Sequence, residues 1–250
     1  MDGKIVYTCG KENVLRFGMT EIEEKAYYKN EDIVSVILPG SVKKIGEGAF
    51  FACSNMKSIS LPGGLADIER EAFCDCKSLE EVIFPEGLRS IGYRAFCGCE
   101  SLSAVTIPGT VNCTGCDSFK GCRGLESVTL GDGLKMIVAG SFAGCGIKSL
   151  TMPGSITAVG DYAFANAFAL ETAVISAGLS YIAEKAFYCC EALRSITVPK
   201  SVKTVEEDAF WGACGIREVY YKGSRKEWKK IDIDYGNRSL QEANIRYNSK

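Results

Sequence analysis

Apolar residues recur along this chain at a fixed spacing. An alanine–aromatic pair, or a close substitute, returns every 23 residues, with a single step of 22. The aromatic members of these pairs are Tyr27, Phe50, Phe73, Phe96, Phe119, Phe142, Phe164, Phe187 and Phe210. Nine copies in constant phase predict a solenoid, in which each repeat packs only on its two neighbours.

Each repeat also predicts one strand. Apolar residues stand six, nine and eleven positions after the aromatic, and the last two alternate with small polar residues, as in Ser58-Ile59-Ser60-Leu61. This period of two is typical of a half-buried strand. Pro62-Gly63 follows, and proline ends a strand while glycine permits the turn. We therefore expect the strands of successive repeats to stack in parallel as a ribbon sheet.

The rest of each repeat returns the chain to the next strand. This arm is too short and too broken for a long helix, so we predict a second short extended piece and then a single helical turn around Ala49-Phe50. The predicted fold class is a β-rich α/β solenoid, a right-handed superhelix with a parallel ribbon sheet, short return strands and helical turns.

The two ends of the chain depart from the repeat. We predict one continuous domain with an N-terminal cap (1–18), nine repeats (19–224) and a C-terminal cap (225–250), because the end units of a solenoid must cover its core.

Each cap has its own pattern. Ile5, Tyr7, Val14 and Phe17 around residues 10–13 predict a hairpin. At the other end, Ser224 and Glu227 form a capping box before a short helix with Trp228, and residues 244–247 predict a strand.

The amino-acid composition excludes several classes of function. The 250 residues contain no histidine, so no histidine-based triad or mixed Cys/His zinc site can form, and we expect no enzyme activity and no cofactor. With a net charge of −2, the chain does not have the excess of basic residues that nucleic-acid-binding proteins use, so we expect no nucleic-acid partner. The N-terminus has no signal-peptide profile and no run approaches 18 apolar residues, so no membrane insertion is expected.

Thirteen cysteines are the least ordinary feature of the composition. Six share the position three after the aromatic, where the first copy has Asn30; they are Cys53, Cys76, Cys99, Cys122, Cys145 and Cys190. We interpret this position as a tight turn whose side chain faces inward and touches backbone polar groups. Cys74 and Cys97 lie one repeat apart, within the range for a disulfide.

Cys113 and Cys116 form a CxxC motif in the least regular repeat, where Thr114 replaces an expected apolar residue. CxxC can be redox-active or supply half of a zinc site. No second half is present in the sequence, so a weak metal or thiol site stays an alternative to simple repeat degeneration.

The repeat closely resembles the BspA-type leucine-rich repeat. Its motif stands here as Leu61-Pro62, Leu65, Ile68, Ala72-Phe73, Cys76, Leu79 and Val82, and the match runs from Met19 to about Tyr221. The resemblance implies a leucine-rich-repeat superhelix that is secreted or located at the cell surface and binds host or bacterial surface proteins. The family has no catalytic residues that could be assigned to positions of this sequence. The family's usual glycine, present as Gly46, is replaced in other repeats, for example by Glu69, so this position cannot require a positive φ.

The outward side of the predicted strands is the candidate binding face. Most of it is Ser or Thr, which also suits a solvated sheet that binds nothing, whereas scattered apolar residues can mark contacts. The candidate partner-binding residues are Ile37, Ser58, Ser60, Glu81, Ile83, Thr106, Thr129, Thr151, Val174, Thr197, Glu218 and Tyr220. A second row, one after the aromatic, places Tyr28, Phe51, Tyr188 and Trp211 at the two ends.

The sequence thus predicts a non-enzymatic protein-binding module, with bacterial surface adhesion or host interaction as the role that the resemblance implies. Two alternatives stay open. One is an intracellular, cytoplasmic interaction scaffold, and the other is the thiol or metal protein centred on Cys113 and Cys116.

Overall fold

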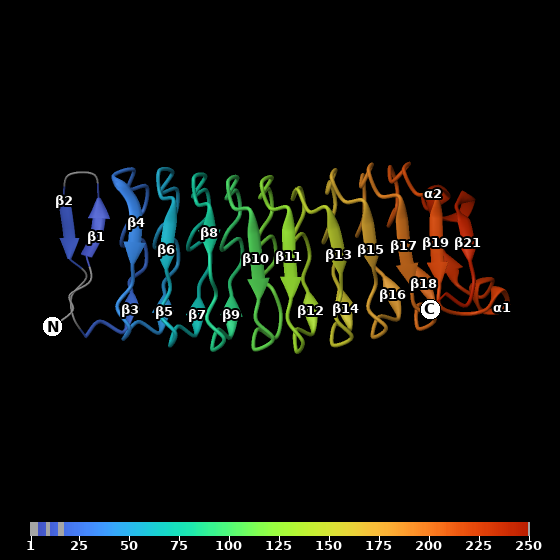
Figure 1. Cartoon of the computed structure of the whole chain (residues 1–250), viewed down its shortest axis with the longest axis horizontal. Helices are drawn as coiled ribbons and strands as arrows, with labels where there is room; N and C mark the ends of the chain where they lie inside the picture. The colour runs from blue at the N-terminus through green and yellow to red at the C-terminus, as the bar shows by residue number, and fades with distance from the viewer. Residues whose placement is uncertain (1–4, 9–10, 15–17, 250) are drawn as a thin grey trace.

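The computed structural model describes residues 5–8, 11–14 and 18–249, with side chains from 18 to 249. The molecule is elongated, and its turns are stacked along the long axis between an N-terminal hairpin and a C-terminal pair of short helices (Figure 1). This arrangement confirms the predicted solenoid.

One strand from each repeat contributes to the first face. These strands are β4 (Ile33–Ile37), β6 (Ser58–Ser60), β8 (Glu81–Val82), β10 (Ala104–Ile107), β11 (Ser127–Leu130), β13 (Ser149–Thr151), β15 (Thr172–Val174), β17 (Ser195–Val198) and β19 (Glu218–Tyr221). Neighbours pair in parallel, except between β8 and β10 and between β11 and β13, and equivalent residues lie opposite each other, as Ser35 with Ser58 and Ser195 with Glu218. The period-2 pattern therefore predicted these strands and their register.

The return arms form a second parallel ribbon from two-residue strands. These are β3 (Glu21–Ile22), β5 (Lys44–Ile45), β7 (Asp67–Ile68), β9 (Ser90–Ile91), β12 (Met136–Ile137), β14 (Ala158–Val159), β16 (Tyr181–Ile182), β18 (Thr204–Val205) and β20 (Asp232–Ile233). The irregular repeat contributes only a single bridge, between Cys113 and Met136. The expected second extended piece is thus present.

The predicted helical turn around Ala49-Phe50 is wrong. In every repeat the residues two before and two after the aromatic have positive φ, as Gly48 (57°) and Ala52 (53°) do. A helix cannot continue through a left-handed residue, so the arm is a series of tight turns. The turns of adjacent repeats are joined by hydrogen bonds. The N–H of each aromatic except Phe210 donates to the carbonyl of the residue just before the aromatic of the next repeat; Phe50 N to Ala72 O is 2.8 Å.

The glycine four residues before the aromatic is favoured for a reason other than its backbone conformation. Gly46 is not left-handed, in agreement with the prediction, but a Cβ built on it would lie 2.8 Å from the carbonyl oxygen of Ile22. The close approach of adjacent turns favours glycine there.

An Ala52→Gly protein is expected to be more stable by about 0.5–1 kcal/mol, since the strain of about 1–2 kcal/mol at a left-handed alanine exceeds the entropic cost of glycine. Urea denaturation measures the change. Ala66→Gly is the matched control, because Ala66 is not among the left-handed residues, and it should lose about 0.5–1 kcal/mol. A loss of stability in Ala52→Gly would contradict the strain argument.

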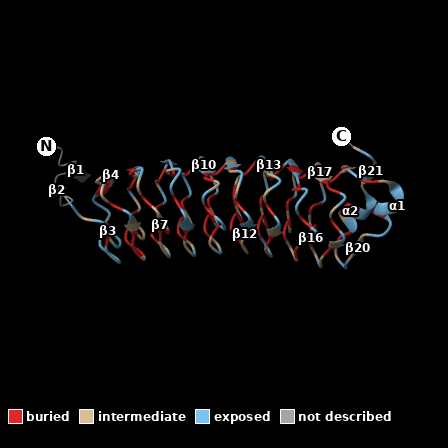
Figure 2. Cartoon of the chain, turned by 90° about the horizontal axis from the view of Figure 1, so that it is seen from below, coloured by how far each residue is buried: buried red, intermediate tan, exposed pale blue. Residues whose placement is uncertain are grey.

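The core is a stack of rings running through the array. Tyr27 and the eight phenylalanines lie face to face, with neighbouring centroids 5.0–5.6 Å apart. All eight phenylalanines are 0–1% exposed. Buried and exposed residues alternate around each turn along the molecule (Figure 2), so every repeat contributes one layer to a continuous interior.

The N-terminal cap is the predicted hairpin. β1 (Ile5–Thr8) pairs antiparallel with β2 (Lys11–Val14) on one side and with β4 on the other. It therefore covers the first edge of the strand face. Phe17, expected in this cap, lies outside the described residues.

The C-terminal cap forms a tenth turn. The capping box is present at α1 (Arg225–Trp228), with Ser224 N donating to Glu227 Oε2 at 2.7 Å, and Trp228 is buried. After α1, β20 extends the return ribbon beside β18, and after α2 (Arg238–Glu242) the predicted last strand, β21 (Asn244–Arg246), pairs with β19. The cap thus continues both sheets although its sequence leaves the repeat. No helix among the described residues is long and apolar enough to cross a membrane.

Candidate binding surface

The strand face presents its alternate residues to solvent, as the sequence predicts. In β6 and β10 the outward residues are exposed and the residues between them are buried. Of the candidate residues, those exposed are Ser58, Ser60, Glu81, Ile83, Thr106, Thr129, Thr151 and Val174, and those half-buried are Ile37, Thr197, Glu218 and Tyr220. Most of this face is therefore an open surface of hydroxyls.

Ile83 is the most prominent apolar residue of the face, at 72% exposed, against 36% for Val174. It lies where the sheet is interrupted, because β8 and β10 do not pair as a ladder. Backbone contact there includes a bond from Ser103 N to Glu80 O, 3.3 Å long. The interruption leaves a hollow of about 620 Å³ that Ile83 and Thr106 help to line.

Carboxylates surround this hollow. Glu80, Glu81 and Glu86 line it, and none of the three forms an ion pair within residues 18–249. The hollow therefore combines one exposed aliphatic side chain with free negative charge.

Phe84 accompanies the interruption of the sheet. It stands where most other repeats have a smaller apolar residue, such as Leu61, is buried, and packs edge-on against Phe96 and Phe119 with centroids 5.4 and 6.4 Å away. The sequence pattern selected Glu81 and Ile83 but missed Glu80 and Glu86. The available signal was a phenylalanine at a position where most repeats have a smaller apolar residue.

Glu218 and Tyr220 are engaged by the C-terminal cap. Asn244 Nδ2 donates to Glu218 Oε1 at 3.0 Å and Arg246 Nη2 to the same oxygen at 3.3 Å. The guanidinium of Arg246 and the amide of Asn244 lower the pKa of Glu218. Tyr220 lies opposite Arg246 in the sheet. These two residues are less available to a partner than the residues near Ile83.

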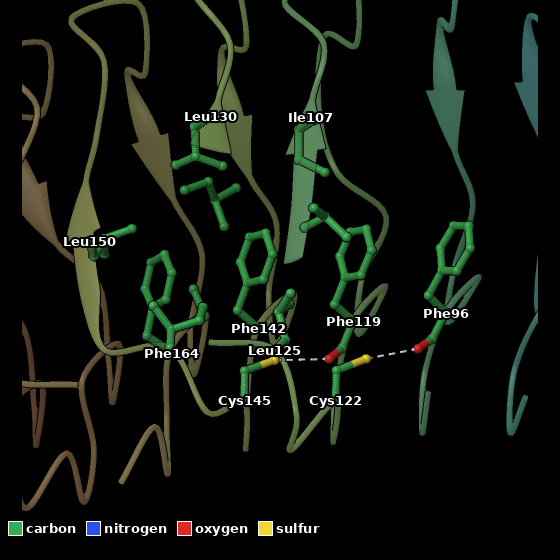
Figure 3. Close-up of a cluster of buried hydrophobic side chains, with 14 of the residues drawn as sticks. Phe96, Ile107, Phe119, Cys122, Leu125, Leu130, Phe142, Cys145, Leu150 and Phe164 are labelled. Carbon is green, nitrogen blue, oxygen red and sulfur yellow. Dashed lines mark hydrogen bonds between the residues drawn. The ribbon is translucent and has the colours of Figure 1, made fainter. Parts of the chain in front are cut away.

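The repeated cysteines form an internal row of thiols. Each donates to the carbonyl of the aromatic in the previous repeat; Cys122 Sγ lies 3.1 Å from Phe96 O, and Cys145 Sγ lies 3.0 Å from Phe119 O (Figure 3). The predicted inward turn position that touches backbone polar groups is therefore confirmed. All twelve described cysteines are free thiols.

Alkylation by iodoacetamide at pH 8 is expected to separate these thiols by position. Burial raises the pKa of Cys53 to about 11 and of Cys190 to about 12, so both are protonated and unreactive at pH 8. The exposed Cys113, Cys116 and Cys214 should react first. Peptide mapping at timed intervals measures this order, and labelling in urea should remove it. Early labelling of Cys190 in the folded protein would contradict the structure.

Cys74 and Cys97 are adjacent, as predicted, and free. The neighbouring Cys74 thiol and Arg94, whose Nη2 donates to Cys97 Sγ at 3.6 Å, lower the pKa of Cys97. A disulfide between them stays an untested prediction.

The CxxC residues lie at the surface. Cys113 and Cys116 are exposed, and the described residues contain no group of three or more His, Cys, Asp or Glu side chains placed to hold a metal. Thr114 between them is buried, and its hydroxyl bonds Ser141 Oγ at 2.7 Å and accepts from Val138 N at 3.0 Å. The unexpected threonine thus has a structural role.

The fold and this surface define a leucine-rich-repeat solenoid. The chain belongs to the BspA-type leucine-rich-repeat family. The model of this family, described as "BspA type Leucine rich repeat region", matches residues 20–137 and 114–231, with six copies of the repeat. The family relation agrees with the resemblance seen in the repeat motif.

Solved structures of bacterial repeat proteins are similar in part. A leucine-rich repeat protein from Bacteroides ovatus is 20% identical, with 97% of this chain and 80% of that chain covered and a TM-score of 0.45. A leucine rich cell surface protein from Faecalibacterium prausnitzii is 21% identical, with 94% and 90% covered and a TM-score of 0.40. A leucine-rich repeat protein from T. pallidum is 20% identical, with 92% and 79% covered and a TM-score of 0.43. No curated protein matches the chain.

Proposed function

We propose that this protein is a non-enzymatic binding module that recognises a host or bacterial surface protein through its strand face, centred on Ile83. The supporting observation is the hollow between β8 and β10, where an aliphatic side chain that is 72% exposed lies among three carboxylates that have no ion-pair partner in the described part of the chain. In protein interfaces, most of the binding energy comes from a few such apolar residues surrounded by polar groups.

The chemistry of the hollow favours a partner with complementary features. An apolar side chain would cover Ile83, and lysine or arginine residues would face Glu80, Glu81 and Glu86. The serine and threonine side chains on either side supply hydrogen bonds at the rim. A cell-surface or secreted location is part of the proposal and is supported by the family relation.

Affinity capture tests the proposal. The intact chain, immobilised and exposed to host and bacterial surface extracts, should retain a specific protein, and Ile83→Ser should weaken retention at least about tenfold. Met136→Ser is the matched control, since Met136 is also exposed (42%) but lies on the return ribbon, and it should retain the same protein. No specific capture, or capture that Ile83→Ser leaves unchanged, would reject the strand-face assignment.

We infer, as a second candidate, an interaction scaffold in a reducing compartment. Its support is the set of twelve free cysteines, three of them exposed, because oxidising compartments favour disulfides. Thiol alkylation of the protein taken directly from its native compartment distinguishes the two locations: full labelling of Cys113, Cys116 and Cys214 supports the scaffold, and oxidised forms reject it.

A further inference from the structure

One repeat is a residue shorter than the others. The step from Phe142 to Phe164 is 22 residues, and the missing residue falls in the turn before the next strand. Between the cysteine position and the following apolar residue, the neighbouring repeats have two residues, Arg123-Gly124 and Phe168-Ala169, whereas this repeat has Gly146 alone.

The deletion lies where a set of backbone bonds between the turns comes to an end. Earlier turns are linked by N–H···O bonds from Ser78 to Ser54, Ser101 to Lys77 and Gly124 to Glu100, at 3.3, 3.0 and 2.9 Å. Within the described residues this set stops at Gly124. Gly146 still lies close to the previous turn, as Gly124 does: a Cβ on Gly146 would be 2.3 Å from the carbonyl oxygen of Arg123, and a Cβ on Gly124 would be 2.5 Å from that of Glu100.

The shortened turn leaves a hollow of about 720 Å³ between its two neighbours. Its floor is small and apolar, from Ala143 to Gly146. Phe168 forms one wall and is 57% exposed, an unusual position for a phenylalanine in this chain. The volume lies within the range of about 300–1,000 Å³ that small-ligand and side-chain pockets have.

The opposite wall is cationic. Arg123 and Lys120 line it; Arg123 makes no ion pair among residues 18–249, and Lys120 Nζ lies 3.4 Å from Asp117 Oδ1. No carboxylate lines this hollow. An adjoining hollow of about 280 Å³ contains Asp117 and Asp161, so the negative charge lies beyond Lys120.

We propose that this hollow is a second binding site, which accepts a peptide segment carrying an aromatic or aliphatic side chain next to a carboxylate. The apolar side chain packs between Phe168 and Ala143, and the carboxylate pairs with Arg123, whose guanidinium can bind both carboxylate oxygens. The site lies on the turns, away from the strand face, and rests on the proposed function only in taking a peptide as the ligand.

Defined peptides test the site with the full-length, isotope-labelled protein. The probe is acetyl-Glu-Phe-Glu-amide, followed by amide chemical shifts and titration; acetyl-Lys-Phe-Lys-amide and acetyl-Glu-Ala-Glu-amide are the comparison peptides. The acidic phenylalanine peptide should shift resonances of residues 143–146 and 168, and each comparison peptide should bind at least about fivefold more weakly.

Three changes should weaken binding of this probe at least about tenfold: Phe168→Ser, Arg123→Glu, and insertion of one serine between Gly146 and Ile147, which restores the 23-residue spacing and fills the hollow. Lys77→Glu is the control, because Lys77 is exposed at the same position of a repeat as Arg123 but lies two repeats away, and it should leave binding unchanged.

Equal binding of the acidic and basic peptides, no shift at residues 143–146, or unchanged binding after the serine insertion would each overturn the proposal. The Ile83→Ser protein separates the two sites, since it should bind the peptide normally. Loss of peptide binding with intact Ile83-dependent capture would reject the hollow alone, and the reverse result would reject the strand face alone.

Discussion

A Phe119→Ala protein is expected to lose about 3–5 kcal/mol of unfolding free energy and to unfold in two steps. Phe119 is fully buried, and its ring is stacked between Phe96 at 5.3 Å and Phe142 at 5.4 Å. Removing the ring from the middle of the stack leaves a cavity in both interfaces of that repeat. Because repeats are stabilised only by their neighbours, the two halves of the array then become less coupled.

Urea denaturation followed by tryptophan fluorescence and by circular dichroism measures both effects, because Trp211 and Trp228 report only on the C-terminal half. Phe168→Ala is the matched control: this phenylalanine is 57% exposed and outside the stack, so the change should stay within about 0.5 kcal/mol. A small effect of Phe119→Ala with coincident transitions would show that the stack does not couple the repeats.

The strands of this fold could be predicted because their signal is repeated and local. The alternation of polar and apolar residues, as in Ser58-Ile59-Ser60, indicates which side chains face inward. The constant spacing of the repeats places equivalent residues opposite one another in the sheet. The repeated cysteine position could be interpreted for the same reason, since its exchange with Asn30 indicated a side chain in contact with the backbone.

The tight turns of the return arm could not be predicted from their residue types, although its short extended piece was. Lys25, Ala52, Glu71 and Arg94 all have positive φ, although such residues carry no preference for it. Their conformation follows from the bonds between adjacent turns, as Glu71 N to Tyr93 O at 2.8 Å, which exist only once the repeats are stacked. A local pattern contains no information on this requirement.

The candidate site was predictable in outline only. The outward position of Ile83 followed from alternation, but alternation did not indicate the interruption beside it, where Phe84 packs against two rings of the core. Similarly, the 22-residue step was visible in the sequence, whereas the hollow over Gly146 depends on the distance between turns. Both features arise where one copy differs from the others.

Replacement of Asn237 by alanine should have the second largest effect, a loss of about 2–4 kcal/mol concentrated at the C-terminal end. Asn237 is 1% exposed and closes the ladder of the aromatic positions. Phe210 is the last aromatic, and its N–H donates to Asn237 Oδ1 at 2.9 Å in place of the carbonyl that the next repeat would provide. The amide Nδ2 in turn donates to Glu206 O at 2.8 Å and to Asp234 O at 2.9 Å.

Alanine would leave the buried Phe210 N–H unpaired, at about 1–3 kcal/mol, and would remove the donor from the part-buried carbonyls of Glu206 and Asp234, which costs less because water can reach them. Asn237→Asp should be nearly as damaging, since a carboxylate can still accept from Phe210 but cannot donate to the two carbonyls. Asn112→Ala, at an exposed position, is the control and should stay within about 0.5 kcal/mol.

Hydrogen exchange resolved along the chain gives the decisive measurement. In Asn237→Ala, amide exchange should accelerate from about residue 206 to the end of the tenth turn and stay unchanged near Phe50, because unfolding of a solenoid can begin at its least stable end. Uniform acceleration along the array would mean that the repeats open as one unit. Unchanged exchange at the C-terminal end would mean that the tenth turn does not depend on this amide, and that α1 with the buried Trp228 is sufficient to hold it.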